Sequence, residues 1–249
     1  MVSFASHELR TPLNSIIAML ETMINNPNKN YLKNAILNAK YLLCMTNDLL
    51  DLAQIKVNKF KLNIKKFNLK YLLVEILEMF QIQAFEQQIN LNMNYDCEEE
   101  IHSDKNRIRQ ILINLLGNSF KFTLNGKICV NVEKYDEFLI QISVEDTGIG
   151  IKQENLSKLF TVFGKIDGEE AINLNQQGVG LGLVISNMIA YQLGDNNNQK
   201  GIEVESEYGY GSIFKFKIYI HKDEANIISN SQQLYQQALF QDNDDILEE

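Results

Sequence analysis

Residues 114–123, Asn-Leu-Leu-Gly-Asn-Ser-Phe-Lys-Phe-Thr, close an apolar-periodic segment that predicts a helix over residues 105–122. Asn114 and Asn118 are one helical turn apart, so both side chains project from one face of that helix. Amide oxygens are hard ligands suited to Mg²⁺, which keeps phosphate oxygens and water in its coordination shell. Taken alone, an asparagine pair is more often polar surface than a metal site, so its meaning depends on its neighbours.

A strongly alternating segment over residues 138–146 predicts a strand that ends in Asp146 to Gly150, Asp-Thr-Gly-Ile-Gly. A carboxylate at a strand end can accept a hydrogen bond from the exocyclic amine of a base. The glycines after it allow a sharp turn and a close approach to a flat ligand. The plainer alternative is an ordinary Asp-x-Gly turn.

A third motif, Gly178 to Gly182 (Gly-Val-Gly-Leu-Gly), opens a helix predicted over residues 181–193. Glycines at a helix N-terminus expose backbone N–H groups to an anion, and the helix dipole adds a favourable field. The run is not a dinucleotide fingerprint, because no parallel βαβ unit surrounds it, and it lacks the Gly-Lys-Ser/Thr ending of a P-loop. Residues 169–177 have no clear periodicity, which predicts a mobile lid.

The remaining periodicity divides the chain into three parts, predicted at residues 1–58, 59–221 and 222–249. In the middle part, strands are predicted over residues 60–65, 89–95, 127–135, 138–146, 202–207 and 212–220. Helices are predicted there over residues 69–88, 105–122, 153–159 and 181–193. We therefore expect an α+β domain of two layers, with helices on one face of a sheet.

Residues 1–58 predict two long helices joined by a turn over residues 25–30. The apolar side of the first comprises Leu9, Leu13, Ile16, Leu20 and Ile24, and His7 points away from it. The second helix repeats Ala35, Ala39, Leu42, Thr46, Leu49 and Ala53. Faces this broad cannot satisfy each other in one antiparallel hairpin, so we expect a dimer that forms a four-helix bundle. Packing on the rest of the same chain is the alternative.

Composition excludes several classes of function. The net charge of −9 disfavours nucleic-acid binding and docking on an acidic membrane surface. The apolar stretches fall short of the roughly 20 residues that cross a bilayer, so we expect this chain to be cytoplasmic. Its three cysteines are widely spaced and form neither a disulfide framework nor a zinc motif. The polar, acidic tail over residues 222–249 predicts disorder or a linker.

The order and spacing of these motifs resemble the sensor histidine kinases of two-component systems. The run Ser6 to Asn14, Ser-His-Glu-Leu-Arg-Thr-Pro-Leu-Asn, resembles their phosphoacceptor box. Five further boxes follow in order: Asn114 to Thr123, Asp146 to Gly150, Phe160 to Phe163, Gly178 to Gly182, and Gly209 to Ser212. The resemblance covers residues 1–221. It implies a dimerising helical hairpin followed by the two-layer ATP-binding fold shared with gyrase and a heat-shock chaperone.

The resemblance also implies a role for individual residues. His7 would take the γ-phosphoryl group, Glu8 would orient the ring and accept its proton, and Thr11 would serve in dephosphorylating a partner. Asp146 would bind the adenine amine, and Asn118 would coordinate Mg²⁺. The nucleotide site would further include Asn114, Lys121, Gly148, Gly150, Phe160, Phe163, Lys165, Gly178, Gly180 and Gly182.

The implied cofactors are ATP and Mg²⁺, and the implied partners are a response regulator receiver domain and a second copy of the chain. A membrane anchor in the full-length protein is compatible with the resemblance. An ATPase of the same fold is one alternative, but it would carry a water-activating Glu where Asn114 stands. A degenerate module that dimerises and binds nucleotide without kinase activity is the other, since only six residues precede His7. Ser119 stands where alanine is commoner in the family.

Overall fold

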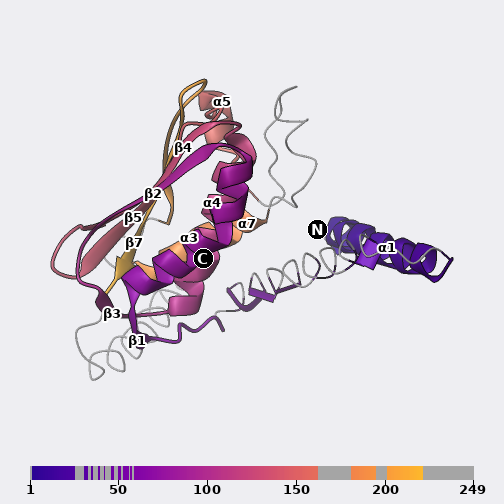
Figure 1. The fold of residues 1–249 in the computed structure, drawn as a ribbon. Coiled ribbons are helices and arrows are strands. Elements are labelled where there is room, and N and C mark those ends of the chain that lie inside the picture. The colour runs from indigo at the N-terminus through magenta and orange to yellow at the C-terminus, as the bar shows by residue number, and fades with distance from the viewer. Residues whose placement is uncertain are drawn as a thin grey trace. The chain divides into compact units, whose positions relative to one another are not determined.

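The structure is a computed structural model, and it describes residues 2–25, scattered positions from 31 to 57, and residues 59–161, 181–194 and 201–220 (Figure 1). The chain divides into two compact units. One comprises Met1–Lys61 with Glu154–Met188, and the other Leu62–Gln153 with Ile189–Glu249. The predicted lid over residues 169–177, the turn at residues 26–30 and the tail over residues 222–249 lie outside the described residues, as do Phe163, Lys165, Gly178 and Gly180.

The second unit is built on a five-stranded sheet of order β2-β4-β5-β7-β6. Its strands are β2 (Ile89–Asp96), β4 (Gly126–Lys134), β5 (Leu139–Asp146), β6 (Glu203–Glu207) and β7 (Gly211–Tyr219). The pairing of β2 with β4 is parallel, and the other three pairings are antiparallel. These bounds lie within one residue of the predicted strands. The sheet therefore confirms the predicted alternation.

A separate two-stranded sheet differs from the prediction. Its strands are β1 (Lys65–Asn68) and β3 (Glu100–Ser103), which pair in antiparallel register. The predicted strand over residues 60–65 is wrong, because only Lys65 of that segment is in a strand. Asn63 of that segment instead contacts the residue that caps α4, since the Asn63 N–H donates to Asp104 Oδ2 at 2.7 Å. The sequence also did not reveal β3, since a four-residue strand is too short for a clear period.

Two helices, α3 (Leu69–Glu86) and α4 (Lys105–Phe122), lie on one face of this sheet (Figure 1). Each begins at a side chain that caps the backbone: Asn68 Oδ1 accepts from Tyr71 N, and Asp104 Oδ1 accepts from Asn106 N and Arg107 N. The rings of Phe80 and Phe120 stack with centroids 5.1 Å apart, which joins the two helices.

The core lies between these helices and the sheet. Fully buried side chains come from both layers: Ile108, Ile111, Leu112 and Leu115 on α4, and Ile128, Val130, Ile140, Ile142 and Val144 on the central strands. Burial of each such side chain stabilises the folded state by about 1.5–3 kcal/mol relative to leaving it exposed. The layered core confirms the predicted α+β class.

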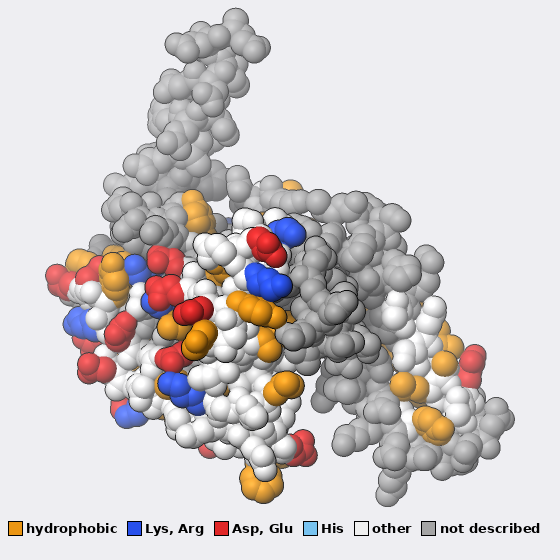
Figure 2. Space-filling model, turned by 90° about the horizontal axis from the view of Figure 1, so that it is seen from above, with side chains coloured by type: hydrophobic (Ala, Val, Ile, Leu, Met, Phe, Trp, Pro, Cys, Tyr) orange, Lys and Arg blue, Asp and Glu red, His pale blue; other side chains and the backbone are white. Residues whose placement is uncertain are grey.

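The exposed face of the sheet is polar. Asn94 Nδ2 donates to Asn131 Oδ1 at 2.7 Å, and Asn131 Nδ2 donates to Ser143 Oγ at 3.3 Å. Lys215 and Glu205 form an ion pair of 2.6 Å on the neighbouring strands. Figure 2 shows the molecule from above, with acidic and basic side chains interspersed among the described residues on that side.

The first unit begins with α1 (Val2–Asn25), which carries the whole run from Ser6 to Asn14. Leu13, Ile17 and Leu20 on this helix are 45, 46 and 42% exposed. Every described position from 31 to 55 is also helical. Apolar side chains this exposed in a single chain are expected where a helix has a partner. Among the described helices, none combines the length and apolar character needed to span a membrane.

Candidate nucleotide site

Asp146 is the last residue of β5 and is only 6% exposed. Its Oδ1 accepts a hydrogen bond from the Gly148 N–H at 2.9 Å, and its Oδ2 accepts one from the Ser119 hydroxyl at 3.3 Å. In the sheet it lies opposite Ile128 of β4 and Ser212 of β7. A carboxylate has about four lone-pair sites, so a buried carboxylate that is held by protein donors and still has one left can accept from a ligand amine.

Burial raises the pKa of the Asp146 carboxyl above its ordinary value, because desolvation disfavours the charged form. The hydrogen bonds from Gly148, Ser119 and the Ser212 backbone act in the opposite direction, and the nearby Glu145 charge raises the pKa further. The carboxyl is therefore buried by the fold but supplied with donors that favour its ionised, acceptor-only form.

The loop after Asp146 is packed too tightly for any residue but glycine at two positions. Gly150 has φ +66°, and a Cβ there would collide with the Glu207 carbonyl oxygen. A Cβ on Gly148 would collide with the Phe122 carbonyl oxygen and approach Asp146 Oδ1. The predicted sharp turn is confirmed. Backbone packing accounts for both glycines, and their contact with a nucleotide stays a prediction.

Backbone hydrogen bonds join this loop to two other elements. The Ile149 N–H donates to Phe122 O at 3.1 Å at the end of α4, and the Gly209 N–H donates to Ile149 O at 2.8 Å from the β6–β7 hairpin. The Ile151 N–H donates to Ser206 Oγ at 2.8 Å. The asparagine motif, the Asp146 motif and the Gly209 motif, far apart in sequence, thus meet at one end of the sheet.

On α4, Asn114, Asn118 and Lys121 are half-buried and fall on one strip of the helix, while Ser119 faces the core. The Lys121 Nζ lies 5.1 Å from the centroid of the Phe122 ring. No group of three His, Cys, Asp or Glu that could hold a metal occurs in the described part of the chain. If Mg²⁺ binds here, the amide oxygen of Asn118 would be a suitable hard ligand, with Asn114 nearby.

Two further predicted site residues lie in described segments of the first unit. Phe160 is half-buried in the turns after α5 (Gln153–Leu156), next to the buried Leu159. Gly182 is the first residue of α7 (Gly182–Leu193), where the Ile185 N–H donates to Leu181 O at 2.9 Å. The first N–H groups of such a helix have no partner within the helix, as anion binding requires.

The phosphoacceptor run lies on α1, as predicted. His7 and Glu8 are helical, but their side chains lie outside the described residues. Thr11, one helical turn after His7, is exposed. The structure therefore presents this part of the helix to solvent at Thr11, and the roles of the three residues stay predictions.

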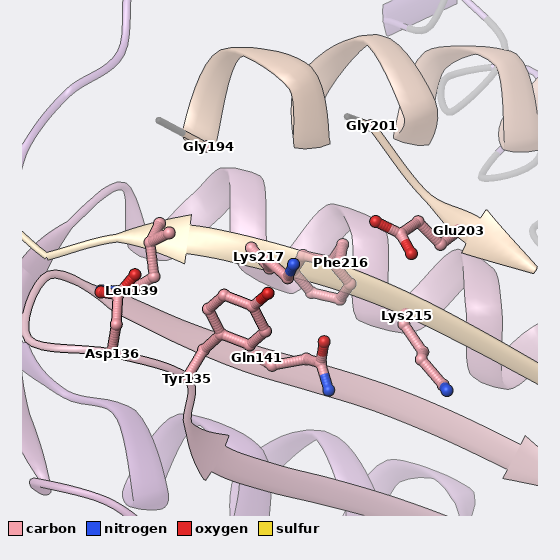
Figure 3. A pocket seen from close by; sticks show the side chains of 10 residues that line it. All are labelled: Tyr135, Asp136, Leu139, Gln141, Gly194, Gly201, Glu203, Lys215, Phe216 and Lys217. Atoms are coloured by element: carbon pink, nitrogen blue, oxygen red, sulfur yellow. The ribbon is translucent and has the colours of Figure 1, made fainter. Parts of the chain in front are cut away.

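A cavity that the sequence did not indicate lies at the other end of β5 (Figure 3). Its volume is about 270 Å³, and its lining includes Tyr135, Leu139, Gln141 and Lys217. The Lys217 Nζ lies 3.6 Å from the centroid of the Tyr135 ring. The lining of this cavity does not include Asp146, so the cavity is not the predicted nucleotide site.

Two protein-family models match the chain. The His Kinase A (phospho-acceptor) domain matches residues 1–57, and the histidine kinase-, DNA gyrase B- and HSP90-like ATPase matches residues 103–222. Hybrid signal transduction histidine kinase B of Dictyostelium discoideum is 35% identical over 223 residues, which are 86% of this chain and 11% of that protein. The chain thus spans a small part of that relative's length.

Solved structures agree with these matches. Full-length ShkA in complex with AMPPNP has a TM-score of 0.65 and 26% identity, covering 86% of this chain and 44% of that chain. Histidine kinase ThkA in complex with response regulator protein TrrA has a TM-score of 0.52 and 22% identity, covering 89% and 61%, which shows likeness in fold. With both domains matched in the order that the motifs require, the chain belongs to the sensor histidine kinases.

Proposed function

We propose that this chain transfers the γ-phosphoryl group of ATP to His7 and then to an aspartate of a response regulator. The observation that carries the proposal is Asp146, buried at the end of β5 and held by Ser119 and Gly148 with acceptor capacity left. The match of residues 1–57 to a phospho-acceptor domain supplies the acceptor half. Two similar solved structures support the proposal. ShkA in complex with AMPPNP supports the nucleotide step, and ThkA in complex with response regulator protein TrrA supports transfer to a response regulator.

The nucleotide is proposed to bind by its adenine amine, which donates to Asp146. Asn118 would contribute an amide oxygen to Mg²⁺, with Asn114 beside it, and Lys121 would meet a phosphate. Mg²⁺, when bound, would neutralise negative charge on the phosphates. Gly178, Gly180 and Gly182 would cradle the phosphates, and Phe160, Phe163 and Lys165 would complete the nucleotide site.

In the transfer step, one nitrogen of the neutral His7 imidazole attacks the γ-phosphorus. The N–P bond forms as the bond from phosphorus to the β–γ bridging oxygen breaks, and ADP leaves with that electron pair. Glu8 takes the proton from the other ring nitrogen. The transition state of such transfers is loose, so positioning and charge neutralisation supply most of the acceleration. An imidazole with a pKa of about 6.5 is largely neutral and competent near pH 7.

Dimerisation through the N-terminal hairpin belongs to the same proposal. Leu13, Ile17 and Leu20 expose between 42 and 46% of their surface in the single chain. A second copy that packs its own hairpin against them would bury these side chains in a four-helix bundle.

The test is incubation of the full chain with γ-labelled ATP and Mg²⁺, beside a His7→Gln variant and a matched His102→Gln control in β3. We expect label that is lost in acid and retained in base, absent from His7→Gln and present in His102→Gln. Nucleotide binding without label would instead support the degenerate binding module. Phosphate release without label would support an ATPase of the same fold.

A further inference from the structure

Ser119 lies on the core side of α4 and is 2% exposed, one residue beyond the proposed metal ligand. Its hydroxyl donates to Asp146 Oδ2 at 3.3 Å, across 27 residues of sequence. A hydroxyl so fully buried needs a partner, and Asp146 provides it. The bond joins the end of β5 to the helix that carries the asparagine pair.

Three groups donate to the Asp146 carboxylate: the Gly148 N–H, the Ser119 hydroxyl and the backbone of Ser212, and the first two come from different directions. Gly148 donates from the loop to Oδ1, and Ser119 donates from α4 to Oδ2. The last torsion of an aspartate is broad and has no sharp staggered wells, so each added donor narrows the orientation of the carboxylate. Ser119 donates to Oδ2 while Gly148 donates to Oδ1, which fixes the plane of the carboxylate, and the lone pairs that remain point away from the donors.

The same bond defines what Ser119 can offer a ligand. A hydroxyl has one proton and two acceptor lone pairs, and the proton is committed to Asp146. Ser119 therefore has no proton left for a ligand and holds Asp146 as an acceptor. An acceptor at this position suits a base with an amino group and leaves the carbonyl of a 6-oxo purine facing oxygen lone pairs, which is unfavourable.

We propose that Ser119 is a positioning residue that sets base selectivity, holding Asp146 as an acceptor for 6-amino purines and against 6-oxo purines. The inference rests on the proposed function, in which Asp146 meets the adenine amine. A purely structural role would instead make Ser119 important for stability and equally important for every nucleotide.

The test measures binding of ATP and of inosine triphosphate, which differs in carrying a 6-oxo group, by calorimetry on the full chain with Mg²⁺. The variants are Ser119→Ala, which removes one oxygen, and Ser119→Thr, which keeps the hydroxyl. Ser143→Ala is the matched control, because Ser143 is also a buried serine that loses one hydrogen bond, with Asn131. Thermal unfolding of each variant shows that it is folded.

We expect Ser119→Ala to reduce the preference for ATP over inosine triphosphate by about tenfold, the effect of one hydrogen bond to a charged group. Ser119→Thr should restore the preference, and Ser143→Ala should leave it unchanged. Equal loss of affinity for both nucleotides in Ser119→Ala, or an unchanged ratio, would overturn the inference.

An Asp146→Asn variant distinguishes failure of the inference on Ser119 from failure of the proposed function. If the proposed function holds, Asp146→Asn weakens ATP binding strongly, whatever Ser119→Ala does to the ratio. ATP binding that withstands Asp146→Asn would overturn both the role of Asp146 and the inference built on it. Failure of the wild-type chain to bind either nucleotide would likewise overturn both.

Discussion

The carbonyl oxygen of Phe122 accepts a hydrogen bond from the Ile149 N–H at 3.1 Å, which ties the last turn of α4 to the loop after β5. The same carbonyl lies where a Cβ on Gly148 would stand. This close approach aligns the helix that carries Asn114, Asn118 and Ser119 with the strand that ends in Asp146. The geometry of the proposed site thus depends on a backbone contact as well as on its side chains.

Replacement of Gly150 by alanine is expected to destabilise the ATP-binding unit. Its φ of +66° disfavours an L side chain, and the new Cβ would meet the Glu207 carbonyl oxygen. We expect a loss of about 1–3 kcal/mol in the free energy of unfolding. Thermal unfolding measures it. Gly117→Ala is the control, because nothing lies within 4 Å of a Cβ there, so it should be neutral or stabilise α4 by up to about 1 kcal/mol. Equal melting temperatures for the two variants would contradict the prediction.

Replacement of Asp104 by alanine is expected to lower the free energy of unfolding by more than the loss of an exposed carboxylate in a turn would. Asp104 is 4% exposed, caps α4 through Asn106 N and Arg107 N, and also accepts from Asn63 N. Loss of a cap costs about 0.5–2 kcal/mol, and here a further buried donor would lose its partner. Urea titration would show a lower midpoint.

The control for that titration is Asp136→Ala, whose carboxylate also accepts from two backbone N–H groups but in an exposed turn. A midpoint change in Asp136→Ala as large as that in Asp104→Ala would contradict the importance of the buried cap.

Affinity for ATP is expected to decline as pH falls toward the raised pKa of Asp146. Burial moves that pKa above the ordinary 3.8, so the carboxyl takes up a proton at a higher pH than an exposed aspartate does. Protonation removes negative charge and acceptor capacity from the site. Calorimetric dissociation constants from pH 8 down to the limit of the folded state measure the effect. Asp146→Asn has no such carboxyl and reports the titration of ATP itself, so identical profiles for the two proteins would refute the prediction.

The same raised pKa has a consequence for stability. The folded state holds the proton of Asp146 more tightly than the unfolded state does, because the pKa is raised in the folded state. The contribution of this group to the free energy of unfolding therefore falls as pH rises from the ordinary pKa to the raised one. Asp146→Asn should remove that contribution. Melting temperatures of both proteins across this window would show a steeper decline with pH in the wild type, and parallel curves would argue against it.

A charge on the exposed apolar side of α1 is expected to break the proposed dimer. Ile17→Glu would place a carboxylate where the second copy packs. Burial of that unpaired charge would destabilise the dimer. Light scattering should show the mass of one chain for the variant and of two chains for the wild type. Thr22→Glu is the matched control, because Thr22 is exposed on the opposite side of the helix. Dimers in both variants would disprove the proposed interface.

Local patterns in the sequence determined much of this fold. The bounds of α4 agree with the predicted helix over residues 105–122, because its apolar period and the cap at Asp104 are both local. The alternation of β5 and β7 was readable for the same reason, since buried and half-buried residues alternate over part of each strand. The order of the motifs also sufficed to identify the family.

Only the tertiary structure decided which distant segments meet. The parallel register of β2 with β4, the pairing of β1 with β3 and the bond from Ser119 to Asp146 join residues 27 or more positions apart. A local period says which side chains face the core but not which strand lies beside which, because pairing is selected by the packing of the whole sheet. The sequence therefore identified Asp146 as an acceptor, whereas folding alone brought Ser119 to its second oxygen.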